Sequence, residues 1–191
     1  MSLNENILFK DSLKLNSKKI IGKNDFGLGN TKSKEISKKI YHIDSLITDS
    51  NYSFKDFTFN SSPNALNLLG LGVFKNYKTT ISWSEKKLIL ENNNKQNNFN
   101  HDTFGFGIAL SDESKKVIIS SITEDSEADL KGFELGAEVQ MVNNLRFKNS
   151  KSLCDFKDEI SKNNPITIKL KVNDEIKTYK LFKQKLFKHS I

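Results

Sequence analysis

The glycine-containing turn at residues 104–108 is the part of this sequence best suited to chemistry. It consists of Phe104-Gly105-Phe106-Gly107-Ile108, and Ala109 and Leu110 continue it into a predicted strand. Glycine permits positive φ angles and close approach of the backbone to a ligand. Successive N–H groups that point one way form a site for an anion. Such a turn can receive a carboxylate on the N–H groups of Phe106, Gly107 and Ile108, but by itself the stretch is more typical of an ordinary glycine turn with aromatic residues in the core.

Side chains for other kinds of chemistry are sparse. Cys154 is the only cysteine, and its apolar neighbours favour a small buried residue over a nucleophile. The histidines His42, His101 and His189 lie far apart in sequence, so they predict no metal site, and we expect no cofactor. The motifs of serine hydrolases, phosphate-binding loops and zinc proteases are absent from the sequence.

The basic charge of the chain does not by itself predict a nucleic-acid partner. The formal net charge is +7 over 191 residues, yet Arg146 is the single arginine. Arginine makes most bidentate contacts to bases and phosphates, so we expect no nucleic-acid binding. Binding of an anionic polymer through bulk charge stays open as a minor alternative. No apolar window is long enough for a membrane span.

A polar, amide-rich segment at residues 91–102 divides the chain. It has no apolar period of either kind and cannot bury a face. We predict a linker here, between a domain at 1–90 and a domain at 103–191.

The segment after the linker predicts several strands and two short helices. Strands are expected within residues 104–110, 116–122, 138–142, 166–172 and 176–182, from apolar alternation and bounding turn residues. A helix at 126–131 can be capped by Asp125 or Ser126, and a helix near 152–162 by Ser152.

Finer features of this segment are also predicted. Asn143-Asn144 fits a type I′ turn, because asparagine tolerates positive φ. Leu153, Phe156 and Ile160 share one face of the second helix by their spacing.

The segment before the linker is predicted to be rich in β structure. Residues 52–59 indicate a strand, and residues 79–83 and 87–90 indicate a hairpin around a polar turn. The most apolar stretch, 65–74, predicts a buried strand that turns into a short helix at one of its glycines.

Five motifs of the second segment, taken in order, resemble those of a PDZ domain. They are Gly105-Phe106-Gly107-Ile108, Ile119–Ile122, Ser126-Glu127-Ala128, Lys131–Gly136 and Val142-Asn143-Asn144. These look like the family's Gly-Leu-Gly-Phe-type loop, Val-Ser-x-Val, Ser-Pro-Ala, Ala-Gly-Leu-x-x-Gly-Asp and Val-Asn-Gly. Glu127, Ala137 and Asn144 depart from the family's Pro, Asp and Gly. The resemblance covers residues 104–183.

The resemblance implies a small, partly open β barrel with two helices. Two strands follow the second helix, which looks like the bacterial, circularly permuted arrangement, in which the last strand takes the place of the first. The implied partner is an extended peptide or a protein C-terminus, bound between the first strand and the second helix. The implied binding residues are Gly105, Phe106, Gly107, Ile108, Ala109, Leu110, Ser152, Asp155, Phe156 and Glu159.

The first segment is similar to the C-terminal part of a retropepsin-like aspartic protease domain. Residues 67–90 look like the family's Leu-Leu-Gly-x-Asp-Phe-Leu stretch and last strands, with Gly72 where the family has Asp. Residues 43–46 and 52–59 look like the strands that precede it. The resemblance implies a partial acid-protease-like β barrel over roughly 6–90, in a mainly β chain that also contains α+β elements.

The catalytic turn of such proteases is absent, because no Asp-Thr-Gly or Asp-Ser-Gly occurs in the sequence. Pepsin-type chemistry needs two carboxylates that share a proton, so we expect no catalytic residue and no peptide cleavage by this chain. Either the chain begins just after the catalytic turn, or it is an inactive relative. The resemblance implies a parent bacterial aspartic peptidase, periplasmic or secreted, with a possible homodimer through the first domain. The alternative is a non-catalytic peptide-binding adaptor.

Overall fold

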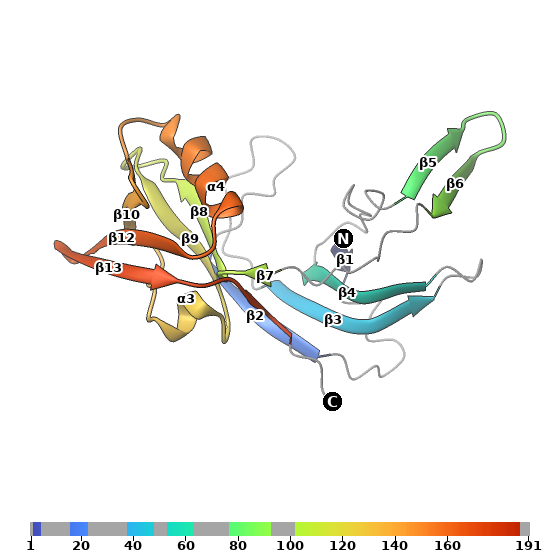
Figure 1. Cartoon of the computed structure of the whole chain (residues 1–191), viewed down its shortest axis with the longest axis horizontal. Coiled ribbons are helices and arrows are strands. Elements are labelled where there is room, and N and C mark those ends of the chain that lie inside the picture. Colours follow the sequence, from blue (N-terminus) through green and yellow to red (C-terminus); the bar gives the residue numbers. More distant parts are fainter. Residues whose placement is uncertain are drawn as a thin grey trace. The chain divides into compact units, whose positions relative to one another are not determined.

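The computed structural model describes residues 2–4, 16–22, 38–47, 53–62, 77–92 and 102–187. These residues are mainly β with two helices, which confirms the predicted class, and the chain divides into two compact units (Figure 1). The described strands form open sheets rather than closed barrels. Closure needs the first and last strands of a sheet to pair, and no such pairing occurs within the described residues. None of the described helices is long and apolar enough to cross a membrane.

The first unit is built of paired strands. They are β1 (Ser2–Asn4), β3 (Lys38–Ile47), β4 (Ser53–Ser62), β5 (Tyr77–Ser82) and β6 (Lys87–Asn92). β4 pairs with β3 antiparallel and with β1 parallel, and Tyr41 of β3 stacks on Phe59 of β4 with ring centroids 5.4 Å apart. The predicted strand at 52–59 and the predicted hairpin are confirmed as β4 and β5–β6. The apolar stretch 65–74 lies outside the described residues.

The second unit contains residues 18–22 of β2 and the described chain from Asp102 onward. Its strands are β2 (Asn16–Gly22), β7 (Asp102–Thr103), β8 (Phe106–Leu110), β9 (Val117–Thr123), β10 (Glu138–Val142), β11 (Leu145–Arg146), β12 (Ile166–Val172), β13 (Glu175–Leu181) and β14 (Gln184–Lys185). Its helices are α3 (Glu127–Leu130) and α4 (Ser152–Lys162).

The strands of the second unit pair antiparallel around β9 and β10. β9 pairs with β8, with β10 and with β2, while β12 lies between β10 and β13. The predicted strands and both helices are present, but β2 and the short β7–β14 pair were not predicted. Ser126 caps α3 by accepting a hydrogen bond from the Asp129 N–H, as predicted.

The core of the second unit follows the predicted alternation of apolar residues. Ile166, Ile168 and Leu170 of β12 are fully buried, and their neighbours on the other face are not. Phe156 of α4 is 0% exposed, and Leu153 and Ile160 pack beside it on the core, which confirms the predicted helix face. This core fixes α4 over the strands.

Predictions for two local features are wrong. Asn143 has φ 49°, but Asn144 has no positive φ, so the turn is not type I′, which needs positive φ at both positions. Cys154 is exposed rather than buried, because it lies two residues from Phe156 and therefore points away from the core face of α4.

Replacing the buried aromatic ring of α4 should cost much of the stability of the second unit. We expect Phe156→Ala to lower the free energy of unfolding by about 3–5 kcal/mol, because it removes a fully buried ring and leaves a cavity. The control on the same helix, Cys154→Ala, changes an exposed side chain and should stay within about 0.5 kcal/mol of the parent. Urea unfolding measures both values. Equal losses in the two variants would show that Phe156 contributes no core packing.

Candidate functional site

The turn before β8 is held by hydrogen bonds to its backbone on both sides of Gly105. The Gly105 N–H donates to Thr103 Oγ1 at 3.0 Å. The Gly105 carbonyl accepts from the Thr123 N–H at 2.7 Å and from Ser126 Oγ at 3.3 Å. Gly105 is buried and has φ +82°, and a Cβ added there would overlap the side chain of Ser126. The turn therefore requires glycine at this position.

The register of β8 on β9 decides which backbone groups face outward. Phe106 lies opposite Ile122, and the bond from Thr123 N–H to the Gly105 carbonyl runs just beside this pair. That arrangement is the non-hydrogen-bonded type of antiparallel pair, in which the N–H and C=O of both residues point away from the partner strand. The Phe106 N–H consequently points toward the edge of β8 that is opposite to β9.

Ile108 repeats this orientation after an irregularity in the ladder. The register shifts between Gly107 and Ile108, which brings Ile108 opposite Ile119. Ile119 uses its N–H on the Ala137 carbonyl and its carbonyl on the Gly136 N–H, so its polar groups face away from β8. The Ile108 N–H therefore also points to the outer edge of β8.

The predicted third donor, the Gly107 N–H, is oriented differently. Gly107 pairs with Ser121 in the ladder next to the outward-facing Phe106, so its N–H points toward β9. A Cβ at Gly107 would collide with the Ser121 hydroxyl. Gly107 thus permits close strand pairing, and the predicted anion site retains the N–H groups of Phe106 and Ile108.

The side chains of β8 join the apolar core. Ile108 is buried, while Phe106, Ala109 and Leu110 are half-buried. The Phe106 ring packs on Phe133 with centroids 5.3 Å apart. Within the described residues, β8 pairs with β9 alone, so its outer backbone edge has no partner strand there.

Helix α4 packs against β8, but two of its candidate side chains are used by the fold itself (Figure 1). Ser152 is buried, and its hydroxyl accepts from the N–H groups of Lys148 at 3.1 Å and Asn149 at 3.4 Å. The expectation that Ser152 caps the helix is wrong, because Lys151 occupies that position and offers no capping side chain. Phe156 is fully buried in the core.

The remaining two candidates of α4, Asp155 and Glu159, differ in exposure and in hydrogen bonding. Asp155 is exposed. Glu159 accepts a hydrogen bond from Asn143 Nδ2 at 2.7 Å, and Asn143 Oδ1 in turn accepts from the Thr167 N–H at 2.8 Å. Asn143 therefore connects α4 to β12, and Glu159 acts as a support of the helix. Its pairing with Asn143 was not visible in the sequence, because the two residues lie 16 positions apart on different elements.

A metal site has no support within the described ranges, where no group of three or more His, Cys, Asp or Glu side chains could hold an ion. Residues 67–76, which carry most of the resemblance to aspartic proteases, lie outside those ranges. The candidate site therefore consists of the Gly105 turn, the outer edge of β8 and the adjoining helix α4.

The requirement for glycine at position 105 can be tested with a matched pair of substitutions. Gly105 and Gly132 both have positive φ, but a Cβ at Gly132 meets nothing within 4 Å. We expect Gly132→Ala to destabilise the chain by about 1–2 kcal/mol through its backbone conformation alone. Gly105→Ala should cost clearly more, because its methyl group also displaces Ser126. Thermal unfolding compares the two, and a Gly105→Ala variant as stable as Gly132→Ala would contradict the close approach to Ser126.

No protein-family model matches this chain, and no curated protein is significantly similar to it.

Proposed function

We propose that the second unit is a PDZ-like module that binds an extended peptide along β8 and receives the peptide's C-terminal carboxylate at the Gly105 turn. The observation that carries this proposal is the outward orientation of the Phe106 and Ile108 N–H groups along an edge without a partner strand in the described residues. A peptide backbone added there completes their hydrogen bonds.

The strand edge favours an extended ligand over a compact one. Backbone N–H and C=O groups on an open edge pair readily with another strand, and alternate side chains of that strand then face the protein. α4 packs against the same strand and supplies a second wall. Binding would thus depend on main-chain bonds for affinity and on neighbouring side chains for selectivity.

The carboxylate belongs at the start of β8. There, the turn held by Thr103, Thr123 and Ser126 fixes the Gly105 peptide plane before the first outward N–H. Hydrogen bonds to a charged acceptor are worth about 1.5–3 kcal/mol each, roughly twice a neutral bond. A free C-terminus is therefore preferred over an internal peptide segment.

The order of elements in the second unit supports the PDZ-like assignment. From β8 the chain continues through β9, α3, β10, β11 and α4 to β12, as the resembled family requires. β13 then pairs with β12, which is compatible with the circularly permuted arrangement. The open sheet is compatible with the partly open barrel of that family.

In this proposal the first unit is a separate part of the chain that does not itself bind the peptide. We retain two possibilities for it: the remainder of an aspartic peptidase to which the module presents substrate, or the scaffold of a non-catalytic adaptor. In both, this chain by itself binds peptides without cleaving them, since the sequence lacks Asp-Thr-Gly and Asp-Ser-Gly.

The function can be tested with the full chain and a displayed library of ten-residue peptides with free C-termini. We expect enrichment of a common C-terminal pattern. The best peptide, labelled at its N-terminus, should bind at least about tenfold more tightly as the free acid than as the C-terminal amide, because the amide loses charge-assisted hydrogen bonds. Fluorescence anisotropy measures both affinities. No enrichment from the library would contradict the proposal.

A second pair of variants tests whether the outward N–H of Phe106 takes part. Phe106→Ala and Phe106→Pro both remove the aromatic ring, but only the proline removes the N–H. Because this N–H points away from β9, its loss should leave the ladder intact. We expect Phe106→Pro to bind the selected peptide at least about tenfold more weakly than Phe106→Ala. Equal affinities, with both variants folded by circular dichroism, would place the peptide elsewhere.

A further inference from the structure

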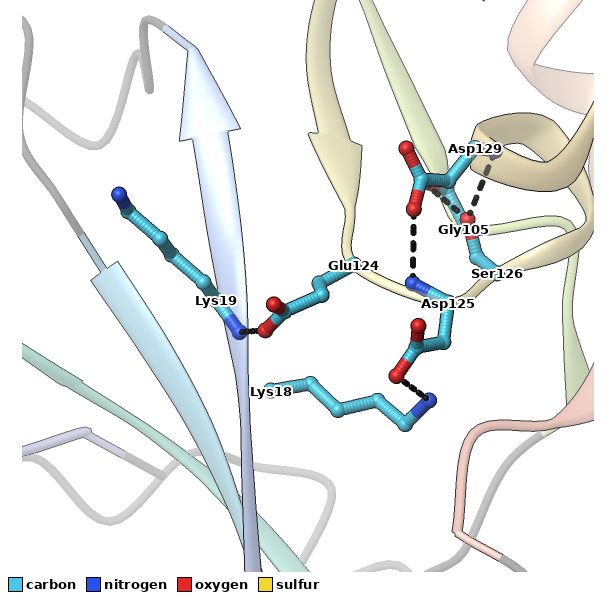
Figure 2. Close-up of polar contacts among 7 residues, drawn as sticks. All are labelled: Lys18, Lys19, Gly105, Glu124, Asp125, Ser126 and Asp129. Carbon is cyan, nitrogen blue, oxygen red and sulfur yellow. Dashed lines mark hydrogen bonds and ion pairs between the residues drawn. The ribbon is translucent and has the colours of Figure 1, made fainter. Parts of the chain in front are cut away.

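The turn between β9 and α3 lies between two parts of the second unit that are far apart in sequence. On one side, the Gly105 carbonyl accepts hydrogen bonds from the Thr123 N–H and from the Ser126 hydroxyl. On the other side lies β2, whose Ile20 is paired with Thr123. Figure 2 shows β2, this turn and Gly105 together.

The backbone of β2 is bonded to this turn in both directions. The Glu124 N–H donates to the Lys19 carbonyl at 2.8 Å, and the Lys19 N–H donates to Glu124 Oε2 at 3.0 Å. Thr123 and Glu124 thus direct successive N–H groups to opposite sides, the first to Gly105 and the second to Lys19. A displacement of β2 from this edge would leave the Glu124 N–H without its acceptor.

An ion pair between Lys18 and Asp125 strengthens the attachment of β2 to the turn, at a residue with an unfavourable backbone conformation. Lys18 Nζ lies 3.2 Å from Asp125 Oδ2, and the Lys18 side chain is only 17% exposed (Figure 2). Asp125 has φ 52°, in the left-handed region that residues with a Cβ disfavour. Its N–H is held by Asp129 Oδ2 at 2.9 Å. Lys18 from β2 and Asp129 from α3 therefore stabilise the same residue from two sides.

The charge of the turn explains why a basic strand fits there. Glu124, Asp125, Glu127 and Asp129 are four carboxylates within six residues. Lys131, the residue that follows α3, lies 3.9 Å from Glu127. Lys18 brings a positive charge to Asp125 from outside the turn, which reduces the mutual repulsion of the carboxylates.

We infer that β2 is a positioning strand for the peptide site. The attachment of β2 to Glu124 and Asp125 fixes the turn between β9 and α3. This turn holds the Gly105 carbonyl through Thr123 and Ser126, and it thereby orients the N–H of Phe106, the first outward N–H of β8. This inference rests on the proposed function for its effect on peptide affinity, while its effect on the Gly105 turn does not need a ligand. Lys18, Glu124 and Asp125 are positioning residues and do not contact the peptide.

The coupling can be measured in the free, full-length chain by NMR and amide hydrogen exchange. Lys18→Glu places two negative charges at the contact. We expect shifted amide resonances at Gly105 and Phe106 and at least about fivefold faster exchange of the Thr123 N–H. The charge swap, Lys18→Glu with Asp125→Lys, should restore both. Asp125→Asn, a milder change that keeps the shape of the side chain, should move the same signals in the same direction.

A matched control separates this coupling from a general effect of charge. Lys116→Glu makes the same change in net charge and breaks a comparable ion pair in the same unit, with Glu138 at 2.8 Å, at the opposite end of β9. It should leave the Gly105 and Phe106 resonances in place. If Lys18→Glu moves them no more than Lys116→Glu does, the inference is overturned.

Peptide affinity provides the last readout. With the selected peptide of the library experiment, Lys18→Glu should bind about fivefold more weakly than the parent, and the charge swap should restore the affinity. If the NMR and exchange effects occur but the parent chain binds no peptide, β2 still positions the turn and the proposed function fails. If the parent binds the peptide and Lys18→Glu binds it equally well, β2 is no positioning strand for the site.

Discussion

The alternating direction of backbone hydrogen bonds along an antiparallel strand is the constraint on which the second unit depends. Each residue of such a strand sends its N–H and C=O to one edge only, and its neighbours send theirs to the other. Along β9 and the turn after it, the Thr123 N–H reaches Gly105 and the Glu124 N–H reaches Lys19. β9 can therefore hold β8 on one edge and β2 on the other. The same alternation leaves the N–H groups of Phe106 and Ile108 on β8 for an additional strand.

Features set by a few neighbouring residues could be predicted from the sequence. The alternation of β12, Ile166–Val172, follows from the two-residue period of a strand, and the cap at Ser126 follows from a hydroxyl three residues before an N–H that it can bind. The turn at Asn173-Asp174, between β12 and β13, has positive φ at both residues, as a type I′ hairpin turn requires. In each case the stabilising contact lies within the segment that shows the pattern.

Features set by distant contacts could not be predicted in this way. Every residue of β2 is exposed or half-buried, so the strand contributes no buried face, and β9, with which Ile20–Gly22 pair, lies about 100 positions further along the chain. The Asn143-Asn144 turn is not type I′, because Asn144 lacks the positive φ that Asn143 has. At this turn the backbone and side chain of Asn143 bind Thr167, and its side-chain amide binds Glu159. Tertiary bonds at Asn143 thus accompany a turn that local preference did not indicate.

The candidate site shows the same division between local pattern and tertiary role. The Gly105 turn was predicted because glycines mark it, whereas Ser152, Phe156 and Glu159, which the resemblance implied as binding residues, have contacts that support the fold. The proposed peptide-binding edge consists of backbone groups, so its position depends on side chains that hold the surrounding elements. Ser152 fixes the chain before α4, and Phe156 fixes the helix on the core. Glu159 connects α4 through Asn143 to β12. Polar residues beside such an edge are therefore expected to be occupied by the protein, and selectivity for a peptide would then depend on the shape of the apolar surface that remains.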